Sequence, residues 1–80
     1  MRVFDPNTDT TLKDVVLYLK ANEAKELLDS LSEMLETNDL NSHSHINDVS
    51  FEHEITVVLY EEQQIDKLNE RSQKIIIEDI

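Results

Sequence analysis

The three histidines and the carboxylates near them are the side chains whose types and spacing point most directly to chemistry. His43 and His45 lie two residues apart, so on a strand both imidazoles project from the same face. Glu54 follows beyond a predicted turn, and neutral imidazole with carboxylate suits zinc or a similar divalent ion. In the strand pairing that places Glu54 on the same face as His43 and His45, the side chain of His53 points to the opposite face. We therefore predict exposed histidines that pair with Glu54 across the strands and no metal site, with His43, His45 and Glu54 as the only candidates for one.

Serine residues also lie near these histidines, and Asp48 is close in sequence, so a Ser-His-Asp combination can be written down. The chain contains no Gly, which removes Gly-rich phosphate loops and the sharp turn that exposes a nucleophilic serine. It contains no Cys, which removes disulfides, cysteine-ligated metals and thiol catalysis. The sequence therefore predicts a protein that is not an enzyme and that uses no cofactor.

Length and charge narrow the class of protein further. Eighty residues, 39% of them hydrophobic, predict one small domain with a small core, in which residues 1–10 form a loose arm or a short edge strand. The 18 acidic and 7 basic residues give a net charge of -11, which argues against direct binding to nucleic acid. No apolar run is long enough for a membrane span, and Met1-Arg2 does not lead into a signal peptide, so we expect a cytoplasmic protein.

The negative charge is concentrated in the middle of the chain. Residues 26–66 contain eleven acidic residues and no Lys or Arg, so the two flanks together are neutral. Four of these acids recur at helical spacing and form one stripe: Glu26, Asp29, Glu33 and Glu36. Such a stripe is either a solvated face, a patch that docks a basic protein, or an imitation of nucleic-acid phosphates in front of a nucleic-acid enzyme. We predict that it binds a basic partner, and that binding weakens as salt rises.

The elements that must position these residues follow from hydrophobic periodicity. Apolar residues at i, i+3, i+4 and i+7 predict an amphipathic helix with Asn22 as its N-cap and an end near Thr37. Runs of β-branched and aromatic residues predict strands over 12–20, 42–46 and 51–60. The periodicity favours a second helix over 63–78, although three consecutive isoleucines at 75–77 are also typical of a strand. The prediction is an α+β fold, β-α-β-β-α, with an antiparallel or mixed sheet and both helices packed on one face.

One face of this predicted sheet lacks a covering layer. If Ile46, Ile55 and Val57 face the helices, alternation sends Tyr18, Val58 and Tyr60 to the other side. Either the arm at residues 1–10 covers that face, or it meets another protein. We predict that Tyr18, Val58 and Tyr60 mediate self-association, most simply as a homodimer.

The segments 17–28, 43–46 and 54–60 also resemble a pattern in small bacterial immunity proteins of contact-dependent and polymorphic toxin systems. The resemblance covers roughly residues 15–60 and consists of a strand, an amphipathic helix and a hairpin. It implies a non-enzymatic inhibitor that neutralises a toxin by binding it, and it assigns no site residue. The leading hypothesis is thus an acidic, immunity- or antitoxin-like protein-binding module. The alternative is a homodimeric structural or regulatory domain with a histidine-based metal site.

Overall fold

The computed structural model describes residues 1–37 and 43–80, which form a small α+β fold as predicted. The loop expected at residues 38–41 lies outside the described residues. The elements divide between two compact units, Met1–Leu17 with Gln63–Ile80 and Tyr18–Glu62, which are described separately. In chain order they are β1 (Val3–Asp5), β2 (Thr10–Leu12), α1 (Ala21–Thr37), β3 (His43–Asn47), β4 (Glu54–Val58), the 3₁₀ segment η1 (Glu62–Lys67) and α2 (Glu70–Glu78).

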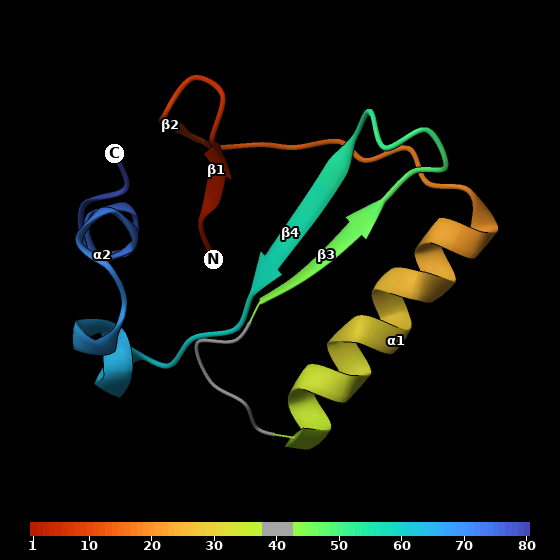
Figure 1. Ribbon diagram of the computed structural model, residues 1–80. Coiled ribbons are helices and arrows are strands. Elements are labelled where there is room, and N and C mark those ends of the chain that lie inside the picture. Colours follow the sequence, from red (N-terminus) through yellow and green to blue (C-terminus); the bar gives the residue numbers. More distant parts are fainter. Residues whose placement is uncertain (38–42) are drawn as a thin grey trace. The chain divides into compact units, whose positions relative to one another are not determined.

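The unit Tyr18–Glu62 is built from one helix and one hairpin. Strands β3 and β4 pair antiparallel, with Ile46 opposite Ile55 and His45 opposite Thr56. Helix α1 lies along this hairpin and contacts β3 (Figure 1). Ile46 from the hairpin and Met34 from α1 are the buried side chains of the core among the described residues. The predicted hairpin and the predicted helix are therefore both confirmed.

The hairpin has two chemically different faces, because side chains alternate along each strand. Ile46 is buried, and Ile55 and Val57 are partly buried. His43, His45, Glu54 and Thr56 are exposed on the other face, as the alternation predicted. The face that packs on α1 thus carries the apolar residues, and the face with the histidines remains open to solvent.

Helix α1 begins one residue before the predicted N-cap. Asn22 lies inside the first turn, so its assignment as N-cap is wrong. Instead the backbone N–H of Lys20 donates a hydrogen bond of 2.8 Å to the Glu23 carboxylate. This is one half of a capping box, in which an acidic residue in the first turn reaches back to the N-cap N–H. The helix ends at Thr37, as expected.

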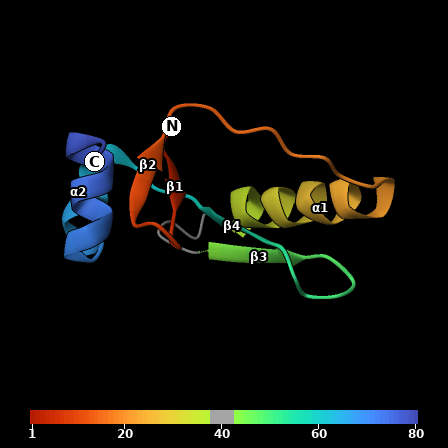
Figure 2. The ribbon, with the colours of Figure 1, turned by 90° about the horizontal axis from the view of Figure 1, so that it is seen from above.

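The second unit joins the N-terminal hairpin to α2. Strands β1 and β2 pair antiparallel over three residues, and the Asp5 carboxylate accepts a hydrogen bond from the N–H of Asn7 in the turn. Arg71 of α2 donates to both the Asp9 carboxylate (2.9 Å) and the Asp9 carbonyl (2.9 Å), and its guanidinium lies 5.1 Å from the centre of the Phe4 ring. Figure 2 shows α2 beside this hairpin. Side chains from opposite ends of the chain therefore hold this unit together.

The strand predicted over 12–20 does not form. Of this range, Leu12 alone belongs to a strand, as the last residue of β2, and residues 13–20 belong to no helix or strand. The strands also divide between two separate two-stranded sheets instead of one. The apolar run at 15–19 has the composition of a strand, but among the described residues no neighbouring strand bonds to its backbone. Without such a ladder, β-branched composition alone does not produce a strand.

The region after β4 is helical, as the periodicity favoured. It consists of η1 and α2 and not of one continuous helix over 63–78. Asn69 lies between the two segments and starts α2, because its side chain accepts a hydrogen bond of 2.8 Å from the N–H of Ser72 and caps this helix. The isoleucines at 75–77 lie within α2, so helix and not strand is the correct assignment.

Candidate functional site

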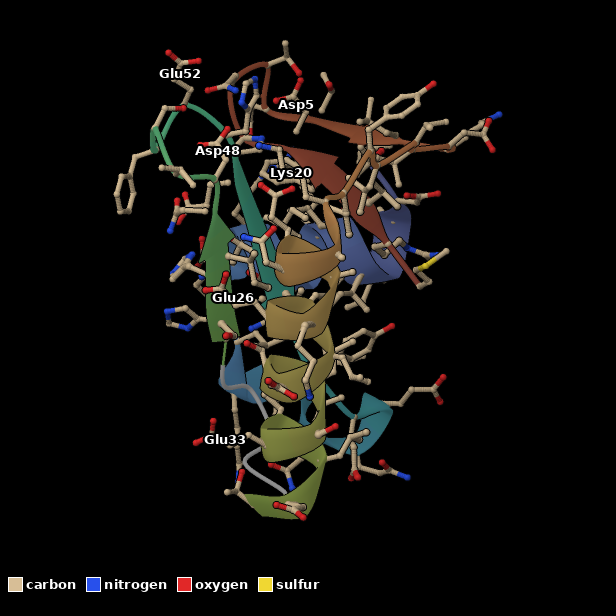
Figure 3. All side chains as sticks on the ribbon, turned by 90° about the vertical axis from the view of Figure 1, so that its right-hand side faces the viewer. Asp5, Lys20, Glu26, Glu33, Asp48 and Glu52 are labelled. Carbon is tan, nitrogen blue, oxygen red and sulfur yellow. The ribbon has the colours of Figure 1, made fainter. Side chains whose placement is uncertain are left out.

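The stripe of four carboxylates on α1, hereafter the carboxylate stripe, lies on an exposed face of the helix. Its members are Glu26, Asp29, Glu33 and Glu36, all exposed. At roughly 100° per residue they span an arc of about 80°. The labelled Glu26 and Glu33 lie on the same side of α1 (Figure 3). The structure therefore places the four predicted docking residues together on one surface.

One member of the stripe has a cationic neighbour. Lys25 Nζ lies 2.7 Å from Asp29 Oδ1, an i, i+4 ion pair in which both side chains are mostly exposed. Among the described residues, no ion pair involves Glu26, Glu33 or Glu36, and the last turn of α1 has no basic residue. The helix dipole adds partial negative charge at this same C-terminal end. The strongest uncompensated negative charge on α1 therefore runs from Glu26 to Glu36.

The hairpin engages its own acidic residues with histidines. His45 Nδ1 lies 2.9 Å from Glu54 Oε1 and 2.8 Å from the Thr56 hydroxyl. This confirms the predicted pairing of an exposed histidine with Glu54 across the strands. The rings of His43 and His45 are 5.0 Å apart, edge to face. In the described parts of the chain, no three His, Cys, Asp or Glu side chains are arranged to hold a metal ion.

The loop between β3 and β4 is organised by Asp48, a role that the sequence reasoning missed. The Asp48 carboxylate accepts hydrogen bonds from the N–H of Glu52 (2.9 Å) and lies 2.6 Å from His53 Nδ1. The bond from the His53 side chain is the main reason that the pKa of Asp48 falls to about 2. The same bond raises the pKa of the His53 ring. An aspartate that opens a turn, with a histidine five residues later, is the signal that could have revealed this contact.

The same cluster shows why Ser50, Asp48 and His53 do not form a catalytic arrangement. Ser50 Oγ donates to Asp48 at 3.3 Å, and His53 contacts Asp48 as well. Nucleophilic catalysis instead needs the serine to contact the imidazole, with the carboxylate on the far side of the ring. The geometry therefore supports a structural role in the loop for these residues.

The three residues predicted for self-association do not share a sheet face. Tyr18 lies in the segment before α1, outside any strand, and is 93% exposed. Val58 ends β4 opposite His43, with an exposed side chain, whereas Tyr60 follows the strand and is partly buried. The placement of Tyr18 on the open sheet face was therefore wrong, because the strand that would have carried it is absent.

A hollow of about 410 Å³ lies in the unit Tyr18–Glu62, at the start of α1 and the β3–β4 loop. Its two carboxylates are already bonded, Glu23 to the N–H of Lys20 and Asp48 to His53. The lining residues are Tyr18, Lys20, Glu23, Asp48, Val49 and Ser50. This hollow offers apolar contact and not a free acid–base pair.

Comparison with protein-family models, curated proteins and solved structures gives no match. The resemblance to immunity proteins therefore stays a prediction. Among the described residues, neither α1 nor α2 has the length and apolar character of a membrane span. The carboxylate stripe remains the feature on which a functional argument can be built.

Proposed function

We propose that this chain is a non-enzymatic, cytoplasmic protein-binding module that docks a basic protein through the carboxylate stripe of α1 and inhibits it, in the manner of an immunity protein or antitoxin. The observation that supports this is the exposed arc of Glu26, Asp29, Glu33 and Glu36, in which only Asp29 has an ion-pair partner within the part of the chain that the structure describes.

Electrostatics favour a docking role over a structural one for this stripe. Like charges at i, i+3 and i+4 destabilise an isolated helix, so the stripe does not help α1 to fold. Its neighbours in the window 26–66 include no Lys or Arg, and Lys25 pairs with Asp29, so the local field is only partly neutralised within the unit. Such a field accelerates encounter with a basic partner and favours binding at low ionic strength.

The stripe also constrains the kind of partner. Rigid carboxylates on a helix about 25 Å long present charges at regular intervals. A basic groove that normally holds a nucleic-acid backbone offers matching cations, so a nucleic-acid enzyme is one class of target. The second class of target is a protein with a basic docking patch but without such a groove. Inhibition of a nuclease or polymerase by the purified chain distinguishes the first class from the second.

The test compares two triple variants with equal loss of charge. One carries Glu26→Gln, Glu33→Gln and Glu36→Gln in the carboxylate stripe, and the other carries Glu52→Gln, Glu61→Gln and Glu62→Gln elsewhere in the same unit. The immobilised chain is first used at 50 mM NaCl to isolate its partner from the native host. The purified partner is then titrated with the parent and both variants between 50 and 500 mM NaCl.

We expect the stripe variant to bind the basic partner at least tenfold more weakly than the parent, and the control variant to stay within about threefold. Added salt should weaken the parent and the control more than the stripe variant, because fewer charge contacts remain to be screened in the latter. Equal weakening in both variants would show that net charge, and not the stripe, governs binding.

A further inference from the structure

Helix α1 has a second exposed face, which is apolar. Ala24, Leu28, Leu31 and Leu35 form this leucine stripe, and the three leucines are 56%, 37% and 67% exposed. Apolar residues at this spacing normally face a core. Here α1 instead turns Leu27 and Met34 toward the hairpin, and these two are the better-covered apolar side chains of the helix. The leucine stripe is thus left over after the unit has folded.

The two exposed faces of α1 point in different directions. At roughly 100° per residue, the residues that approach the hairpin, the leucine stripe and the carboxylate stripe occupy three separate arcs of the helix. A molecule that binds to the leucine stripe therefore does not cover the carboxylate stripe. Within α1, the charged residue nearest to the leucines on the side away from the hairpin is Lys25, which is paired with Asp29.

The spacing of the leucine stripe is the same in both directions along the helix. Its four positions are separated by four, three and four residues, which is the a/d spacing of a coiled coil. A two-fold axis midway between Leu28 and Leu31 therefore brings the stripe onto itself in an antiparallel pair of helices. Leu28 then faces Leu31 of the second copy, and Ala24 faces Leu35, a small side chain against a large one.

The charges of α1 also favour an antiparallel pair. Its one internal cation, Lys25, lies in the N-terminal half, whereas the last turn has Glu36 and no basic residue. An antiparallel arrangement brings Lys25 level with the acidic C-terminal turn of the second copy, where the helix dipole also favours a cation. A parallel arrangement would place the two acidic C-terminal turns side by side.

From these observations we propose that the leucine stripe of α1 is the interface of an antiparallel homodimer with a second copy of this chain. The interface is a single short helix pair, which places it among the small, weak interfaces, so we expect a dimer that dissociates on dilution. The two carboxylate stripes point away from this interface and remain accessible. Each copy carries a net charge of -11, so salt strengthens this dimer by screening the repulsion between copies.

Sedimentation equilibrium of the full chain at 5–500 µM tests the proposal. We expect a monomer–dimer equilibrium that tightens several-fold between 50 and 500 mM NaCl. Leu28→Ser with Leu35→Ser should weaken the dimer at least tenfold, whereas the control Val49→Ser, at an exposed apolar residue of the β3–β4 loop, should leave it unchanged. A monomer throughout, or a dimer that survives the double substitution, overturns the proposal. Circular dichroism confirms that the variants remain folded.

Disulfide trapping provides a second readout that does not weaken the interface by polar substitution. The chain has no cysteine, so single Ala24→Cys and Leu35→Cys variants each carry one thiol. The two variants are mixed in equal amounts, and oxidised glutathione is added as the oxidant. They should form a mixed disulfide-linked dimer at least tenfold faster than either variant forms a disulfide with itself. Disulfides formed within each single variant would indicate parallel pairing and overturn the proposal. The proposal is also overturned if the mixed dimer of the Ala24→Cys and Leu35→Cys variants forms no faster than a mixed dimer of either variant with Val49→Cys.

Discussion

The two compact units use their charged residues in opposite ways. In the unit Met1–Leu17 with Gln63–Ile80, both arginines of the chain are engaged. Arg71 binds Asp9 and the carbonyl of Ile80, and Arg2 donates to the carbonyls of Ile75 and Ile76 at the end of α2. In the unit Tyr18–Glu62, the stripe on α1 has one ion pair, Lys25 with Asp29. The first unit therefore uses its arginines to hold itself together, whereas α1 of the second unit displays the carboxylate stripe at its surface.

In a chain with little core, the two units are thus stabilised by different kinds of interaction. Arg2 and Arg71 replace apolar packing between segments that are more than sixty residues apart in sequence. The hairpin unit relies instead on apolar contact between α1 and β3, which leaves the carboxylate stripe of α1 without a structural task. Stability and the proposed binding therefore depend on different side chains, and each can be tested separately.

The largest expected effect is on the apolar contact of the hairpin unit. Ile46→Ala should reduce the free energy of unfolding by about 3 kcal/mol, because it removes a buried side chain and leaves a cavity against α1. The matched substitution Val58→Ala, on an exposed residue of the same hairpin, should cost less than about 1 kcal/mol. Urea unfolding followed by circular dichroism measures both. Equal losses would mean that the hairpin does not bury its Ile46 face against α1.

A smaller effect is expected from the charged contacts of the other unit. Arg71→Ala should cost about 1–2 kcal/mol, because it removes the bonds to Asp9 and Ile80 and the contact with Phe4, all partly screened by solvent. The control Lys74→Ala lies on the same helix and removes no hydrogen bond or ion pair of the described residues. Amide exchange in α2 distinguishes the two. If α2 is equally protected in both variants, the arginine is not what anchors it.

The smallest effect concerns pH and the β3–β4 loop. The pKa of Asp48 is about 2, below its ordinary 3.8, so its contribution to stability is present above about pH 4 and is lost as pH falls through 2. The pKa of His53 is raised above 6.5, so its contribution is present below pH 6.5 and is lost as pH rises through the raised value. The loop should therefore be tightest between about pH 4 and 6.5.

Proton NMR titration of the His53 ring checks this prediction. In the parent the ring should titrate above 6.5, and in Asp48→Asn its pKa should fall toward that ordinary value, because the largest cause of the shift is the bond to Asp48. Ser50→Ala, which removes only a 3.3 Å bond to the same carboxylate, serves as the control. A His53 pKa that does not respond to Asp48→Asn would contradict the contact.

Local patterns in the sequence predicted most of the elements but not their long-range partners. The helical periodicity of α1, the alternation of β3 and β4 and the helix at the isoleucines of α2 are properties of neighbouring residues, and all were predicted. The strand at 12–20 failed, because a strand exists only where another backbone pairs with it. The contacts of Arg71 with Asp9 and of Arg2 with Ile76 join residues 62 and 74 positions apart, and no local pattern encodes them.

For the candidate site, the positions of the carboxylates were predictable and their surroundings were not. Glu26, Glu33 and Glu36 follow from helical spacing alone. Which face of α1 would approach the hairpin did not follow, because the apolar arc is wider than the hairpin can cover. The structure assigns the covered positions to Leu27, which is partly buried, and Met34, which is buried, and it leaves the leucine stripe exposed.

The central claim is that the unit Tyr18–Glu62 presents its carboxylates for binding, whereas the other unit does not. Its most direct test is to titrate the ¹³C,¹⁵N-labelled chain with an octa-lysine peptide and to follow the amide and side-chain carboxyl signals. We predict that shifts concentrate on Glu26, Asp29, Glu33 and Glu36, and that Asp9 and Asp79, which lie beside Arg71 and Arg2, respond least. Equal shifts at the acidic residues of both units would contradict the claim.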